Sequence, residues 1–180
     1  MTAHQAALEA LTRYFGYDSF RPGQQGIVEA LLAGRDVLGV MPTGAGKSVC
    51  YQIPAALSPG MTLVISPLIS LMRDQVDALN DLGLPAAFIN TTQTPDEQAM
   101  VFAQAAAGQI KLLYVAPERL ETGRFRDFAA RTPISLIAVD EAHCVSQWGQ
   151  DFRSSYLGIG DFIAGLPQRP PVGAFTATAT

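Results

Sequence analysis

Short apolar runs alternate along the chain with longer segments in which apolar residues recur every three or four positions. The runs rich in β-branched residues predict strands, at residues 36–40, 62–66, 86–89, 111–115, 134–139 and 172–175. Helical spacing predicts helices at 4–15, 22–34, 49–53, 67–83, 94–108, 117–120 and 155–166. The alternation is typical of βαβ units, so we expect an α/β fold with a mostly parallel sheet covered by helices on both faces.

Capping residues mark several of the predicted helix ends. Pro22 suits the first position of a helix, where its missing N–H is not needed. Thr94 is a candidate N-cap, with Glu97 three residues later. Glycine tolerates the left-handed conformation that often ends a helix, which predicts ends near residues 34, 83 and 108.

The predicted topology places chemically active residues at one edge of the sheet. Ligands of such sheets bind beyond the carboxyl ends of the strands. Lys47, Asp140, Glu141 and Thr176 each follow a predicted strand. We therefore expect them to converge on one site.

The turn at residues 41–48 (MPTGAGKS) lies between a predicted strand and a predicted helix. Its backbone N–H groups and the helix dipole favour an anion, while Lys47 can reach the β- and γ-phosphates and Ser48 can bind Mg²⁺. A glycine-rich surface turn is the alternative, but it leaves the Lys-Ser pair at the helix start unexplained. The candidate nucleotide-binding residues of this turn are Thr43, Gly44, Ala45, Gly46, Lys47 and Ser48.

Two adjacent carboxylates follow the strand at 134–139. Asp140 can hold Mg²⁺ directly or through water, and Glu141 can orient and deprotonate a water that attacks a γ-phosphate. The alternative is an acidic pair that caps the next helix. Nucleotide hydrolysis needs both a phosphate turn and such carboxylates, so together they predict a nucleotide hydrolase in which Lys47, Asp140 and Glu141 are catalytic. His143, the last residue of Asp-Glu-Ala-His, is counted with this catalytic set as a link from the hydrolysis site to neighbouring elements.

Composition narrows the function classes. The 180 residues are 48% hydrophobic and 16% charged, which suits one globular domain. No apolar run is long enough to span a bilayer, so we expect a cytoplasmic protein with no membrane contact. Cys50 and Cys144 are the only cysteines, so neither a disulfide framework nor a zinc site is expected, and His143 has no partners at ligand spacing. The net charge of −4 argues against a large nucleic-acid footprint.

The motifs together resemble the RecQ family of DNA helicases over nearly the whole chain. The resemblance rests on the phosphate turn, on FRPGQ at 20–24, ISPLISLM at 65–72 and YVAPERL at 114–120, on DEAHCVSQWGQDFR at 140–153 and on TATA at 176–179. It implies the first of two RecA-like lobes of an enzyme that uses ATP and Mg²⁺ to unwind DNA with 3′ to 5′ polarity. Single-stranded and partly duplex DNA are the implied partners, in DNA repair and recombination near the nucleoid.

The resemblance also assigns roles to single residues. Gln24 corresponds to the residue that reads the adenine edge, where an amide can bond to N6 and N7. Tyr17 and Arg21 correspond to the pair that packs on adenine; a plain turn before a helix is the alternative. The aromatic-rich loop that couples single-stranded DNA to ATP hydrolysis corresponds to residues 146–153, although its aromatics can also be read as core residues. The implied coupling residues are Gln147, Trp148, Phe152 and Arg153.

The chain departs from the family pattern at a few positions and in extent. Met41 and Ala45 stand where glycine is usual, Gln150 where histidine is common and Ser154 where proline is common. Residues 1–180 are expected to form the first lobe, with the adenine motif in 1–34, and to lack the second lobe and the C-terminal domains. The lone lobe is then expected to be nearly inactive. A non-enzymatic nucleotide-binding regulatory module, or an RNA helicase lobe of the same superfamily, stays open as an alternative.

Overall fold

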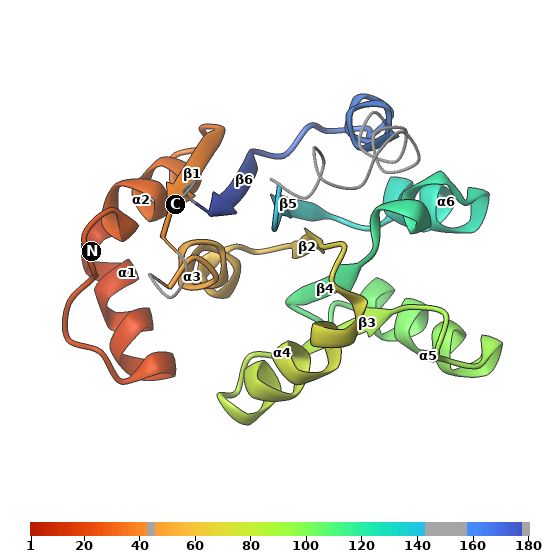
Figure 1. Ribbon diagram of the computed structural model, residues 1–180, viewed down its shortest axis with the longest axis horizontal. Coiled ribbons are helices and arrows are strands. Elements are labelled where there is room, and N and C mark those ends of the chain that lie inside the picture. Colours follow the sequence, from red (N-terminus) through yellow and green to blue (C-terminus); the bar gives the residue numbers. More distant parts are fainter. Residues whose placement is uncertain (43–45, 143–157, 178–180) are drawn as a thin grey trace.

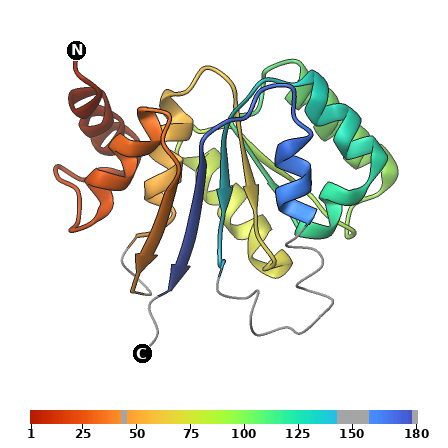
Figure 2. The ribbon, with the colours of Figure 1, turned by 90° about the horizontal axis from the view of Figure 1, so that it is seen from above.

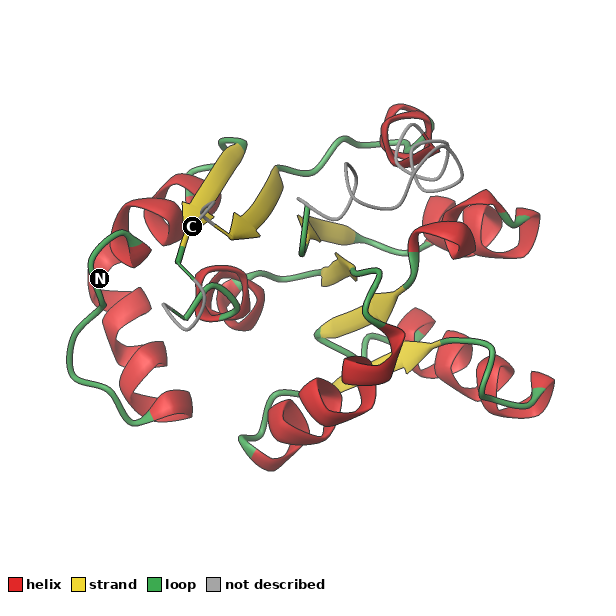
Figure 3. Ribbon diagram, in the orientation of Figure 1, coloured by secondary structure: helices red, strands yellow, loops and turns green. Residues whose placement is uncertain are grey.

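The computed structural model describes residues 1–42, 46–142 and 158–177. Within these residues six strands form one sheet in the order β1-β6-β5-β2-β4-β3, and all neighbouring strands pair in parallel (Figures 1 and 3). The strands are β1 (Val37–Met41), β2 (Met61–Ile65), β3 (Ala86–Ile89), β4 (Leu112–Val115), β5 (Ile134–Val139) and β6 (Val172–Ala177). The predicted α/β class with a parallel sheet is confirmed.

Helices cover both faces of this sheet. The helices of the described residues are α1 (Ala3–Ala10), α2 (Gln24–Leu32), α3 (Val49–Leu57), α4 (Ile69–Asp81), α5 (Pro95–Ala106), α6 (Gly123–Arg131) and residues 158–164, with a π-helical turn at Leu11–Phe15 and a 3₁₀ turn at Pro117–Glu121. Helix α1 packs on α2 and α3. Figure 1 shows α2, α3 and α4 on one side of the sheet and α5 and α6 on the other. Each side has its own apolar core. Among the described helices none combines the length and apolar content needed to cross a membrane.

Strand β1 is more exposed than expected for a sheet that helices cover on both faces. It occupies the edge of the sheet beside β6, and its bounds are shifted by one residue from 36–40. Leu38 and Val40 are 69% and 53% exposed, whereas Gly39 and Met41 face the core. An apolar run does not distinguish a central strand from an edge strand, because that distinction depends on neighbours distant in sequence.

The helix ends predicted from capping residues are confirmed with one exception. The Thr94 hydroxyl accepts a hydrogen bond from the Glu97 N–H at 3.2 Å, as predicted for an N-cap. Gly34, Gly83 and Gly108 have positive φ at the predicted helix ends. Helix α2, however, begins at Gln24 and not at Pro22, because Gly23 at φ 88° interposes a left-handed residue.

Helix α6 was missed by the sequence patterns. Thr122 caps it by accepting from the Phe125 N–H at 3.3 Å. Its apolar contacts come from Phe125 and Phe128, which are both buried, while four of its nine residues are arginine or aspartate. Two aromatics in a charged segment give too weak a periodic signal to predict a helix.

Phe175 of β6 lies over two glycines of the sheet. Gly39 is its partner in the parallel register, and a Cβ there would lie 2.9 Å from the Phe175 ring. A Cβ at Gly173 would also lie 2.9 Å from that ring. The ring is fully buried and its centroid is 5.5 Å from that of Tyr51 on α3. The two glycines thus leave the space in which β6 and α3 pack together.

We predict that Gly39→Ala destabilises the protein by about 1–3 kcal/mol, because the new methyl group overlaps a ring that cannot move within a packed core. Urea unfolding measures the change. The matched control is Gly26→Ala in α2, where no described heavy atom outside the helix lies within 4 Å of the new Cβ. That control should gain about 0.5–1 kcal/mol from helix propensity. Equal stability of the two variants would show that Phe175 is not held as described.

Candidate functional site

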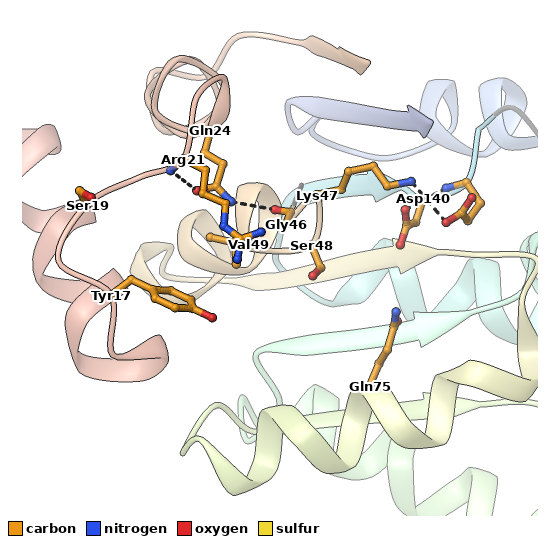
Figure 4. Close-up of a pocket in the computed structure, with 11 residues that line it drawn as sticks. Tyr17, Ser19, Arg21, Gln24, Gly46, Lys47, Ser48, Val49, Gln75 and Asp140 are labelled. Atoms are coloured by element: carbon orange, nitrogen blue, oxygen red, sulfur yellow. Dashed lines mark hydrogen bonds and ion pairs between the residues drawn. The ribbon is translucent and has the colours of Figure 1, made fainter. Parts of the chain in front are cut away.

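A pocket of about 370 Å³ opens at the carboxyl ends of the strands (Figure 4). Figure 2 shows the arrowheads of β1, β5 and β6 pointing to the same edge of the sheet. The predicted site residues that line the pocket are Tyr17, Arg21, Gln24, Gly46, Lys47, Ser48, Asp140 and Glu141. Thr176 was expected at this edge but lies inside β6 and is not part of the lining.

Other predicted site residues lie outside the described residues. In the phosphate turn these are Thr43, Gly44 and Ala45. After the acidic pair they are His143, Gln147, Trp148, Phe152 and Arg153. Their assigned roles stay predictions.

The sequence analysis did not predict three residues that line the pocket: Ser19, Val49 and Gln75. Ser19 lies in the predicted turn and Val49 directly follows Ser48, so their positions could have been inferred. Gln75 lies on α4, and Figure 4 shows its amide directed across the pocket toward Ser48 and Asp140. A polar residue on an amphipathic helix carries no signal of this kind, because the packing of α4 alone aims it at the pocket.

An ion pair joins the phosphate turn to the acidic turn. Lys47 Nζ lies 3.4 Å from Glu141 Oε1, and the side chains are only 13% and 22% exposed. Gly46 has φ 77° and Glu141 has φ 55°, so both turns use the left-handed region. That region is unusual for a glutamate, and such backbone strain is concentrated at functional sites.

The acidic turn is fixed by backbone hydrogen bonds to its neighbours. The Asp140 N–H donates to the Ile65 carbonyl of β2 at 2.9 Å, and the Ala142 N–H donates to the Phe175 carbonyl of β6 at 2.8 Å. The Glu141 N–H donates to Asp140 Oδ1 at 2.9 Å. The two carboxylates therefore project from a turn that the sheet holds on both sides.

The carboxyl group of Asp140 is buried. It is 7% exposed, and its pKa is raised above the usual value, first by burial and then by the neighbouring charge of Glu141. The Glu141 N–H, the Lys47 charge and the Tyr51 hydroxyl oppose this shift. A buried carboxylate with specific charged neighbours in a pocket is a candidate functional group.

Gln24 connects the N-terminal motif to the phosphate turn. It is 3% exposed; its Oε1 accepts from the Arg21 N–H at 2.8 Å and its Nε2 donates to the Gly46 carbonyl at 3.0 Å. The Arg21 guanidinium lies 6.0 Å from the centroid of the Tyr17 ring. The three predicted adenine-contacting residues thus form one wall of the pocket, beside the turn expected to hold phosphate.

The oxygen donors of the pocket fit a magnesium ion. The Ser48 hydroxyl does not cap α3, and it lines the pocket together with the Asp140 carboxylate. Among the described residues no group of three or more His, Cys, Asp or Glu side chains could hold a metal by itself. Mg²⁺ prefers oxygen ligands and is usually bound by one or two carboxylates together with phosphates and water. This donor set therefore fits Mg²⁺ that arrives with a nucleotide.

Comparisons with known proteins give the family that this chain resembles. A family model described as DEAD/DEAH box helicase matches residues 21–180. A protein from Haemophilus influenzae named ATP-dependent DNA helicase RecQ is 51% identical over 173 residues, which are 96% of this chain and 28% of that protein. The protein of the same name from Bacillus subtilis is 47% identical over 175 residues, 97% of this chain and 30% of that protein. The chain thus spans less than a third of these relatives.

Among solved structures, the chain is similar to a hypothetical ATP-dependent RNA helicase from Sulfolobus tokodaii. The TM-score is 0.74 at 21% identity, over 97% of this chain and 50% of that one. At this identity the likeness shows a shared fold.

We predict that Asp140→Asn stabilises the metal-free protein near neutral pH. Because the pKa of Asp140 is raised in the folded state, the unfolded state loses its proton first, and folding stability falls as the pH rises above the ordinary value of 3.8. Removing the charge should therefore raise the melting temperature near neutral pH. The gain should shrink as the pH is lowered through the raised pKa.

The control for this thermal melt is Asp36→Asn. The Arg169 side chain and the Val172 N–H lower the pKa of Asp36, so loss of this charge should destabilise the protein at neutral pH. A drop in melting temperature for Asp140→Asn as well would mean that burial does not penalise the Asp140 charge.

Proposed function

The chain belongs to the DEAD/DEAH box helicases, and among them to the RecQ family, and we propose that it is the ATP-binding lobe of a DNA helicase. One observation carries the proposal: Lys47 and Glu141, which are 94 residues apart in sequence, meet 3.4 Å apart in a pocket that Ser48 and Asp140 also line. These are the two halves of a nucleotide-hydrolysing site.

The phosphate-binding half acts by charge and by backbone geometry. Gly46, Lys47 and Ser48 precede the first residue of α3, so the N–H groups and the positive end of the helix dipole favour the phosphates. Lys47 exchanges its contact with Glu141 for the β- and γ-phosphates. The Lys47 charge therefore faces a negative partner both without nucleotide, where the partner is Glu141, and with nucleotide, where the partners are the phosphates.

The carboxylate half acts on the metal and on the attacking water. Mg²⁺, when bound, neutralises charge on the phosphate oxygens. Ser48 and Asp140 would hold it, and the hydrogen bonds of the acidic turn keep Asp140 in place. Glu141, released from Lys47, orients a water molecule and accepts its proton.

The adenine wall supplies base specificity. Tyr17 and Arg21 pack on the base, and Gln24 bonds to its edge while it stays beside the Gly46 carbonyl. Because Gln24 contacts both the N-terminal motif and the phosphate turn, a bound base and bound phosphates favour the same arrangement of this wall.

DNA unwinding is proposed for the whole protein. The relatives at 51%, 50% and 47% identity are named DNA helicases, which favours DNA over RNA. We expect 3′ to 5′ movement on single-stranded DNA with a second RecA-like lobe that completes the ATP site, in DNA repair and recombination in the bacterial cytoplasm at the nucleoid. The 180-residue lobe should hydrolyse little ATP by itself. Trp148, Phe152 and Arg153 are the proposed link between DNA and Glu141.

We predict that Lys47→Ala weakens binding of MgATP to the chain about 10- to 100-fold. Charge-assisted hydrogen bonds contribute roughly 1.5–3 kcal/mol each, and 1.4 kcal/mol is tenfold in affinity. Isothermal titration calorimetry measures the change. Lys111→Ala is the matched control, because Lys111 donates to the Ser58 carbonyl away from the pocket. Equal affinity of wild type and Lys47→Ala would remove the basis of the proposal.

We predict that Glu141→Gln lowers ATP turnover by about 10²- to 10⁴-fold in the chain extended by a second RecA-like lobe, because the variant cannot accept the proton of the attacking water. Nucleotide affinity should change little. Steady-state ATP hydrolysis and nucleotide titration separate the two effects, with the exposed Glu9→Gln of α1 as control. Hydrolysis by Glu141→Gln at the wild-type rate would exclude Glu141 as the base.

A further inference from the structure

We propose that a buried hydrogen-bond relay from Gln52 through Tyr114 and Tyr51 positions the Asp140 carboxylate for Mg²⁺, with Tyr51 as the positioning residue. The inference rests on the proposed nucleotide site. It assigns a role to side chains that do not line the pocket.

The relay links three elements behind the metal site. Gln52 and Tyr51 belong to α3, Tyr114 to β4, and Asp140 follows β5. The Tyr51 hydroxyl is 3.4 Å from Asp140 Oδ2 and 3.3 Å from the Tyr114 hydroxyl, and Gln52 Nε2 is 3.4 Å from the Tyr114 hydroxyl. Both tyrosines are fully buried, and Gln52 is 6% exposed.

The direction of each hydrogen bond follows from donor and acceptor chemistry. Gln52 Nε2 can only donate, so the Tyr114 oxygen accepts from it. An ionised Asp140 can only accept, so the single proton of the Tyr51 hydroxyl is directed to the carboxylate. The Tyr114 proton is then the one left for the Tyr51–Tyr114 contact. Only this order satisfies all three contacts, and its final donor is directed at Asp140.

The relay and the backbone hold the carboxylate from two sides. Oδ1 accepts from the Glu141 N–H at 2.9 Å, and Oδ2 accepts from Tyr51. Neutral donors of this kind fix the orientation of a carboxylate without cancelling its charge. Carboxylate ligands of metals commonly have such outer partners, whose removal costs about 10- to 100-fold in metal affinity.

Ring packing fixes Tyr51 itself. Its ring contacts Phe175, which lies over Gly39 and Gly173, and the Phe175 carbonyl accepts a hydrogen bond from the Ala142 N–H of the acidic turn.

The relay contacts of 3.3–3.4 Å are longer than the ordinary 2.7–2.8 Å of O–H···O bonds. Contacts at a catalytic site are often long in the ligand-free state and shorten once the ligand binds.

The test is the Mg²⁺ dependence of nucleotide binding in the 180-residue chain. Tyr51→Phe keeps the ring and removes one oxygen. A fluorescent ATP analogue is titrated at increasing Mg²⁺, and the half-saturating Mg²⁺ concentration should rise about tenfold or more. Binding of the analogue in EDTA should not change. Tyr14→Phe removes the hydroxyl of a partly buried tyrosine in the turn Leu11–Phe15, and it should leave the Mg²⁺ dependence unchanged.

A double-mutant cycle distinguishes a relay from independent contacts. Tyr114→Phe should raise the half-saturating Mg²⁺ concentration by a smaller factor, because Tyr51 keeps its bond to Asp140. The double variant should match Tyr51→Phe, because Tyr114 reaches the carboxylate only through Tyr51. Effects that multiply in the double variant would overturn the relay.

Further outcomes are equally decisive. If Tyr51→Phe has the same half-saturating Mg²⁺ concentration as the wild type, with or without a lower melting temperature, the relay only stabilises the fold and the proposal is overturned. If Tyr51→Phe does not fold, an unchanged Mg²⁺ dependence in Tyr114→Phe has the same meaning. If the wild-type chain binds no analogue at any Mg²⁺ concentration, the proposed nucleotide site fails and the relay proposal fails with it.

Discussion

The ion pair between Lys47 and Glu141 brings together two turns that the sequence separates by 94 residues. It can form only because β1 and β5 end at the same edge of a parallel sheet, with β6 between them. In a pocket where both side chains are mostly buried, opposite charges attract more strongly than in water, and neither can be left alone without a large desolvation cost. In the proposed mechanism a bound nucleotide satisfies both side chains, because its phosphates pair with Lys47 while Glu141 contacts water. In the ligand-free protein, Lys47 is therefore paired with the carboxylate that the phosphates would displace.

At Asp140, the function proposed for the carboxylate opposes the stability of the fold. Burial and the charge of Glu141 raise its pKa, so the fold is held together despite this carboxylate. The surrounding structure compensates locally: backbone N–H groups fix the turn, Tyr51 donates to Oδ2, and Phe175 packs on two glycines that leave it space. Natural sites often retain destabilising groups where function needs them. The apolar core on the α3 face of the sheet therefore also holds the Asp140 carboxylate in position.

Much of this organisation could be predicted from the sequence, and the failures have physical causes. The alternation of apolar runs and helical segments predicts the parallel sheet, and the residues that follow β1 and β5 indicate the pocket, because the covalent order fixes where strands end. Periodicity does not reveal which strand lies at an edge, so the exposure of Leu38 and Val40 was unexpected. Gln75 reaches the pocket only through the packing of α4, and Tyr51 reads as an ordinary apolar residue of a helix. The periodicity of apolar residues along the chain does not predict contacts between residues that are distant in sequence.

The most direct test of the account is a crystal structure of the chain with Mg²⁺ and a non-hydrolysable ATP analogue. The account predicts that Lys47 Nζ leaves Glu141 and contacts the phosphates, that the Ser48 hydroxyl and Asp140 lie on the metal side, and that Glu141 faces a water beyond the terminal phosphate. A structure in which the analogue binds elsewhere while Lys47 stays on Glu141 would contradict it.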